Sequence, residues 1–184
     1  MPYVSRGGHK LAHALDAFGV DPTGLVCADL GCSVGGFSDC LLQRGAVKIY
    51  AVDTGYGVLD WKLRSDDRVV VMERTNALHV DIPEPCGLVV VDASWTRQTK
   101  IMPKALSLLA PGGGVVTLVK PHYEARREWL EKGVLPEERH PEVLAGVTAE
   151  LRDSGCDVRG PETSPLRGGK GGNLEYLLYV SLSK

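Results

Sequence analysis

One glycine-rich turn between an apolar run and a helical pattern is the first part of this sequence that could do chemistry. It reads Asp29-Leu-Gly-Cys-Ser-Val-Gly-Gly-Phe37. Gly31 permits a tight turn, and Gly35 and Gly36 would let a ligand lie close to the backbone. A dinucleotide-binding turn would need glycine at position 33, where serine stands, and a phosphate-binding loop would need Gly-Lys-Ser/Thr. Neither phosphate-binding pattern is present in this turn.

A second acidic residue, Asp53, ends the next apolar run, about 20 residues further on, where a side chain can accept hydrogen bonds from a ribose diol. Together with Asp29 and the glycine turn, it suits a nucleoside that carries no phosphate chain. S-adenosylmethionine is the commonest such cofactor, and we expect it to bind here. On this interpretation Gly35→Asp folds but loses the cofactor. The alternative is that the glycines only let a helix pack closely on a strand.

Charged residues also end two later apolar runs. Asp92 follows three valines, and Lys120 follows Val-Thr-Leu-Val. A buried ammonium group is costly without a partner, and Asp92 could be that partner. The alternatives are a purely structural ion pair or an exposed lysine. Taken individually, Glu175 and Lys10 look like ordinary surface charges.

Alternating apolar and amphipathic segments must position these residues. Strands are predicted at 25–30, 47–53, 69–72, 87–92, 115–119 and 174–182. Helices are predicted after Ser5, which could cap the first one, between Gly35 and Gly45, from Ile101 to Leu109, and from Pro141 to Gly155. Residues 160–172 are predicted to form a surface loop. Strands that are apolar on both faces and alternate with helices indicate a doubly wound α/β fold with a mostly parallel sheet.

Length and composition restrict the class of protein. The 184 residues, 43% hydrophobic and 24% charged, predict a single domain spanning 1–184. A net charge of −2 excludes a bulk-basic nucleic-acid coat, so contact with RNA would need a local basic patch. There is no apolar run for a membrane span or signal peptide, so we expect a cytoplasmic protein. Five cysteines without C-x-x-C, and a His9/His13 pair without an intervening glutamate, predict neither a disulfide scaffold nor a metal site.

Six segments together resemble one enzyme family over nearly the whole chain and in the same order. The sequence is similar to the TlyA/hemolysin branch of the FtsJ-like ribose 2′-O-methyltransferases. The segments that carry the resemblance are 3–11, 29–42, 51–57, 73–76, 119–125 and 164–176 with its Ser-Pro and Gly-Asn-Leu-Glu-Tyr ends.

The resemblance implies a Rossmann-like class I methyltransferase fold with a mostly parallel seven-stranded sheet and helices on both faces. It also implies a catalytic tetrad, with Lys120 as the general base, Asp92 orienting it, and Glu175 and Lys10 positioning the ribose hydroxyl and the neighbouring phosphate. Asn76 would face the adenine. The implied S-adenosylmethionine site comprises Asp29, Gly31, Ser33, Gly35, Gly36, Phe37, Asp53, Asn76 and Asp92.

Three features depart from the family pattern. Full-length members carry a small N-terminal RNA-binding domain, and this sequence begins where the methyltransferase begins. Residues 92–97 read Asp-Ala-Ser-Trp-Thr-Arg where Asp-Val-Ser-Phe-Ile-Ser is usual, and residues 120–124 read Lys-Pro-His-Tyr-Glu where Lys-Pro-Gln-Phe-Glu is usual. The tetrad is intact, so these departures concern recognition of the target.

The expected substrate is a structured RNA, ribosomal RNA or a ribosomal subunit, with a separate RNA-recognition protein as a further partner. Basic residues near the two chain ends would contact it: Arg6, His9, Lys10, Arg159, Arg167 and Lys170. The first alternative is a small-molecule O-methyltransferase, which would need an enclosed aromatic pocket, whereas only 6% of the chain is aromatic. The others are a non-catalytic hemolysin-like binding protein and a nicotinamide-dependent oxidoreductase, against which Ser33 speaks.

Overall fold

The computed structural model describes residues 2–168 and 172–183. Seven strands form one sheet in the order β3-β2-β1-β4-β5-β7-β6, and within the described residues only β7 runs against the rest. The resemblance predicts this mostly parallel seven-stranded sheet, and the prediction is confirmed. The strands are β1 (Val26–Leu30), β2 (Lys48–Val52), β3 (Val69–Met72), β4 (Cys86–Val91), β5 (Leu109–Val119), β6 (Cys156–Thr163) and β7 (Tyr176–Leu182).

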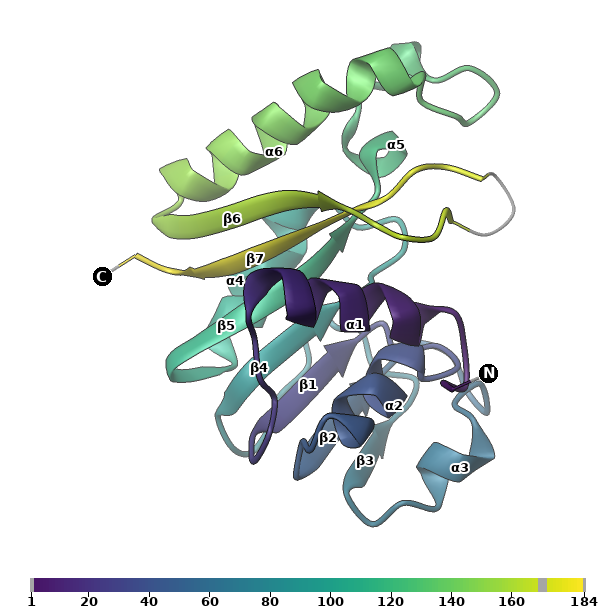
Figure 1. Ribbon diagram of the computed structural model, residues 1–184, viewed down its shortest axis with the longest axis vertical. Helices are drawn as coiled ribbons and strands as arrows, with labels where there is room; N and C mark the ends of the chain where they lie inside the picture. The colour runs from purple at the N-terminus through teal and green to yellow at the C-terminus, as the bar shows by residue number, and fades with distance from the viewer. Residues whose placement is uncertain (1, 169–171, 184) are drawn as a thin grey trace.

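Helices cover both faces of the sheet (Figure 1). One buried cluster joins helices α1 (Gly7–Phe18), α2 (Gly36–Gln43) and α3 (Trp61–Arg64) to Leu88 and Val90 of β4. The opposite cluster joins α4 (Gln98–Ser107) and α6 (His140–Asp153) to Val89 and Val91. Successive residues of β4 therefore serve opposite cores, as expected for a strand with both faces covered. A short helix α5 (Pro121–Glu124) and two 3-10 turns, η1 (Arg127–Trp129) and η2 (Glu137–Arg139), lie between β5 and α6.

Three local predictions differ from the structure. Ser5 is not the N-cap of α1, because Arg6 holds that position, although the Ser5 hydroxyl accepts a hydrogen bond from Gly7 N at 3.3 Å. Helix α4 ends at Ser107, and Leu109 already pairs with Cys86 in the sheet. The predicted loop 160–172 begins inside strand β6, which the Gly160–Pro161 step concealed in the sequence. None of the described helices has the length and apolar character needed to cross a membrane.

Candidate active site

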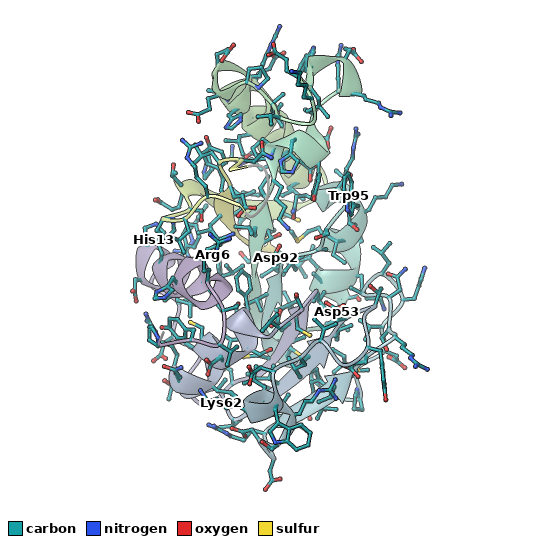
Figure 2. The ribbon with its side chains drawn as sticks, turned by 90° about the vertical axis from the view of Figure 1, so that its right-hand side faces the viewer. Arg6, His13, Asp53, Lys62, Asp92 and Trp95 are labelled. Carbon is teal, nitrogen blue, oxygen red and sulfur yellow. The ribbon has the colours of Figure 1, made fainter. Side chains whose placement is uncertain are left out.

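The predicted acidic and basic residues gather where the parallel strands end. Asp29 lies in β1, Asp53 follows β2, Asp92 follows β4, and Lys120 follows β5. Figure 2 views this edge of the sheet and shows Asp92 between Arg6 on one side and Asp53 and Trp95 on the other. The carboxyl ends of neighbouring parallel strands meet at one edge, so residues distant in sequence become neighbours here.

The reversed direction of β7 brings Glu175 to the same place. Val119, the last residue of β5, pairs with Tyr176, the first residue of β7. Lys120 follows the one and Glu175 precedes the other, so the antiparallel register sets Lys120 and Glu175 opposite each other. A parallel last strand would carry Glu175 to the far edge of the sheet.

The four predicted tetrad residues form two ion pairs. Lys120 Nζ lies 2.5 Å from Asp92 Oδ1, and the Lys10 ammonium contacts Glu175 Oε2. Lys10 and Glu175 are 9% and 4% exposed, so each charge depends on the other for its partner. Removing one member of such a buried pair leaves an uncompensated charge, which is strongly unfavourable.

Two adjoining cavities lie beside these pairs. The smaller, of about 240 Å³, is lined by Lys10, Asp29 and Phe37 among others. The larger, of about 460 Å³, is lined by Lys120 and by the residues that follow β2, β3 and β4. Of the predicted cofactor residues, the following line one or both cavities: Asp29, Gly31, Ser33, Gly36, Phe37, Asp53, Asn76 and Asp92.

Asp29 carries an unusual carboxylate at the smaller cavity. It is completely buried, and its Oδ2 accepts hydrogen bonds from Ser38 N at 2.9 Å and from Ser38 Oγ at 2.7 Å. Its Oδ1 has no hydrogen-bond partner among the described residues. Burial raises the pKa of Asp29 to about 7, with Ser38 opposing the rise. An acceptor left in this state can receive a hydrogen bond from a charged donor in the cavity.

Asp53 joins the turn after β1 to the loop after β2. Its Oδ2 accepts from Ser33 N at 2.8 Å, and its Oδ1 accepts from Gly55 N at 2.7 Å. A carboxylate has about four lone-pair positions, so each oxygen keeps one for a ligand hydroxyl in the larger cavity. Asn76 also lines that cavity, while its Oδ1 accepts from Leu78 N at 2.9 Å.

The structure gives Gly35 a role in packing and does not place it in either cavity lining. Its φ is +101°, and a Cβ there would overlap Leu63 Cδ1 and lie 2.7 Å from Leu59 Cδ1. The prediction that Gly35→Asp folds normally is therefore wrong, because the added side chain meets the core under α3. Gly31 is constrained similarly, since a Cβ at its φ of +89° would lie 2.6 Å from Asp92 O.

Two aromatic residues at the larger cavity were not among the predicted site residues. Trp95 is 85% exposed, has a φ of +57° and lines that cavity. Its ring stacks on Tyr123 with centroids 4.8 Å apart, and Lys120 Nζ lies 5.7 Å from the centre of the Tyr123 ring. Left-handed backbone at a bulky residue is strained and is often found at functional sites. The available signal was an aromatic residue directly after a strand that ends in a predicted site acid.

The predicted RNA-contacting residues do not form one uniform surface. Arg6 is exposed and lines the smaller cavity, whereas Lys10 is buried against Glu175. Arg167 is exposed and pairs with Glu137 at 2.9 Å. Arg159 lies over the ring of Tyr179, at 4.3 Å from its centre. His9 packs edge-on against Tyr3, and Lys170 lies outside the described residues.

Comparison with known proteins gives a consistent result. Residues 3–181 match the family described as FtsJ-like methyltransferase. The protein YqxC of Bacillus subtilis is 42% identical, over 97% of this chain and 65% of its own length. The 16S/23S rRNA (cytidine-2'-O)-methyltransferase TlyA of Mycobacterium tuberculosis is 41% identical, over 97% of this chain and 68% of its own length. The chain thus spans about two thirds of these curated relatives.

Solved structures agree with the sequence relatives. A candidate hemolysin of Streptococcus thermophilus has a TM-score of 0.94 at 40% identity and covers 100% of this chain and 68% of its own. Methyltransferases at 15% to 18% identity have TM-scores from 0.61 to 0.69, which shows a shared fold.

Proposed function

Because this chain belongs to the FtsJ-like methyltransferase family, we propose that it transfers a methyl group from S-adenosylmethionine to a ribose 2′-hydroxyl of structured RNA. The observation that carries the proposal is the meeting of the Lys120–Asp92 and Lys10–Glu175 pairs at one sheet edge, beside two adjoining cavities. The name of the Mycobacterium tuberculosis relative points to ribosomal RNA as the substrate.

The residues around the cavities fit this cofactor. The unpartnered Asp29 Oδ1 suits the ammonium of its amino-acid end, and Arg6, which lines the same cavity, suits the carboxylate. Asp53 has lone pairs for the ribose diol, and Asn76 is placed for the adenine. When bound, S-adenosylmethionine supplies a methyl group that its positively charged sulfur has already activated.

The chain's own residues then prepare the acceptor. A ribose hydroxyl is a poor nucleophile until it loses its proton, and the neutral amine of Lys120 can accept that proton. Asp92, 2.5 Å from this amine, holds it at the junction of the two cavities. The Lys10–Glu175 pair, opposite across the β5–β7 register, orients the ribose and its phosphate. Most of the rate acceleration comes from this positioning.

The mouth of the larger cavity favours RNA over a small metabolite. Trp95 offers an exposed ring beside Lys120 and is the one aromatic residue in the described lining of that cavity. A small apolar substrate would call for an enclosed pocket with several aromatic walls. A nucleobase, by contrast, can stack on a single exposed ring, which is worth about 1–3 kcal/mol per base.

The test is methyl transfer from labelled S-adenosylmethionine to ribosomal subunits, to free ribosomal RNA and to a panel of hydroxylated metabolites. Calorimetric titrations with S-adenosylmethionine and NAD accompany it. We expect binding of S-adenosylmethionine alone and transfer to RNA or to a subunit. Transfer to a metabolite with none to RNA would favour the small-molecule alternative, and binding of NAD alone would refute a methyltransferase.

A further inference from the structure

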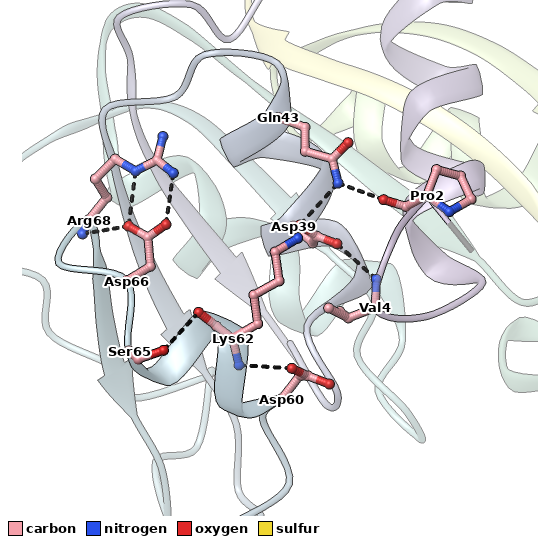
Figure 3. Close-up of polar contacts among 9 residues, drawn as sticks. All are labelled: Pro2, Val4, Asp39, Gln43, Asp60, Lys62, Ser65, Asp66 and Arg68. Carbon is pink, nitrogen blue, oxygen red and sulfur yellow. Dashed lines mark hydrogen bonds and ion pairs between the residues drawn. The ribbon is translucent and has the colours of Figure 1, made fainter.

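Asp39 is a buried acid that lies outside both cavity linings and joins three segments of the chain (Figure 3). Its side chain, in α2, is 1% exposed. Asp39 Oδ2 accepts a hydrogen bond from Val4 N at 2.8 Å, and Oδ1 accepts from Gln43 Nε2 at 3.1 Å and from Lys62 Nζ at 2.9 Å. Burial opposes ionisation, but hydrogen bonds from Lys62, Gln43 and Val4 hold the pKa of Asp39 below its usual value. Asp39 is therefore charged at neutral pH.

The first of these segments, residues 2–8, forms an N-terminal arm that lies against the cofactor turn. Gln43 Nε2 donates to Pro2 O at 2.7 Å, which fixes the start of the arm. Further along, a Cβ on Gly36 would overlap Ser5 Oγ and lie 2.9 Å from Gly8 N, so the arm and the turn are in direct contact. Ser5, Arg6 and Gly7 then line the smaller cavity.

We propose that Asp39 is a positioning residue of the cofactor site, which acts by holding this arm in place as the wall of the smaller cavity. The inference rests on the proposed function, because it takes that cavity to receive the amino-acid end of S-adenosylmethionine. The arm continues into α1, so the same anchor helps to place Lys10 opposite Glu175.

The contacts of Asp39 are distinct from those that hold the fold together. Helices α1 and α2 pack through apolar side chains such as Leu11, Leu15 and Leu41, which are at most 1% exposed. Asp39 contacts the arm through one backbone N–H and contacts α3 through the exposed Lys62. Loss of its charge should therefore loosen the arm while leaving the core packed.

Asp39→Asn tests the inference, because it keeps the shape and removes the charge. The asparagine amide turns an N–H₂ donor toward either Val4 N–H or Lys62, which are themselves donors. We expect the dissociation constant for S-adenosylmethionine to rise about tenfold or more, as for loss of a hydrogen bond to a charged group. Amide hydrogen exchange in residues 4–8 should accelerate, while exchange in the sheet stays as in the wild type.

Two control variants separate the arm from general effects. Asp16→Asn breaks an exposed pair with Arg44, whose bonds are 2.6 and 3.0 Å, and should leave cofactor affinity and exchange in the arm unchanged. Lys62→Met leaves the Val4 and Gln43 donors in place and should weaken binding by less than about threefold. An Asp16→Asn variant that loses as much affinity as Asp39→Asn would overturn the inference.

The outcomes distinguish this inference from the proposed function. Wild-type protein that fails to bind S-adenosylmethionine refutes the proposed function itself. Wild-type binding with unchanged affinity and exchange in Asp39→Asn refutes only the role of Asp39. Should Asp39→Asn fail to fold, Gln43→Ala, at an exposed position, removes the tie to Pro2. It should speed exchange in the arm, and unchanged exchange would overturn the inference.

Discussion

Asp29→Asn should separate the stability of this protein from its capacity to bind cofactor. Because burial raises the pKa of Asp29 from 3.8 to about 7, ionising it in the folded state costs about 4 kcal/mol. Between about pH 4 and pH 7 the folded state holds a proton that the unfolded state has lost, so the stability of the wild type falls as the pH rises. Above pH 7 both states are ionised and this dependence ends.

Asparagine removes this penalty and can keep the hydrogen bonds from Ser38 through its own carbonyl oxygen. We therefore expect Asp29→Asn to exceed the wild type in free energy of unfolding by up to about 4 kcal/mol at pH 8, and by much less near pH 4. Urea unfolding at the two pH values measures the difference. A variant that is less stable than the wild type at pH 8 would refute the reasoning.

The same substitution should harm the cofactor site, because it puts an N–H₂ group where Oδ1 faces the smaller cavity. Loss of a hydrogen bond to a charged group costs about 1.5–3 kcal/mol, which is roughly 10- to 150-fold in the dissociation constant for S-adenosylmethionine. In the wild type, affinity should also gain from ionisation of Asp29 as the pH rises through 7, and this gain should be absent in the variant. Equal affinities for the two proteins at pH 8 would exclude Asp29 from the site.

Three further substitutions have definite expected outcomes. Lys120→Ala should lower the rate of transfer by about 10²–10⁴-fold with cofactor affinity unchanged, and Lys120→Arg, which cannot give up its proton, should be equally inactive in the same assay. Trp95→Ala should raise KM for RNA roughly 5- to 150-fold, from about 1–3 kcal/mol of lost stacking, and calorimetry should show unchanged cofactor affinity. Gly35→Asp should lower the thermal midpoint sharply, because strain at positive φ and overlap with Leu63 each cost about 1–3 kcal/mol; a normal midpoint would contradict this packing.

Much of the site could be predicted from strand ends alone. Asp53, Asp92 and Lys120 each terminate an apolar run, and in a parallel sheet such ends meet at one edge. The pairing of Lys10 with Glu175 could not be derived in this way, because 165 residues separate them and their contact depends on the reversed direction of β7. Only the resemblance to a family indicated that these two residues belong to the site.

Other features were missed because local signals conflict with the tertiary structure. Strand β6 alternates buried Cys156 and Val158 with exposed neighbours, but its Gly160–Pro161 step resembles a turn. The backbone at Trp95 is left-handed, which propensities do not anticipate for a bulky residue. Gly35 was assigned to the ligand because the sequence does not show that Leu59 and Leu63 occupy the space beside it.

The position of the transferred methyl group tests the central claim most directly. Ribosomal RNA or subunits incubated with the protein and S-adenosylmethionine are digested to nucleosides, and mass spectrometry locates the added methyl group. The account predicts a single 2′-O-methylated nucleoside with the wild type and its loss with Lys120→Ala. A methyl group on a base, or the same 2′-O-methylated product from Lys120→Ala at the wild-type rate, would contradict it.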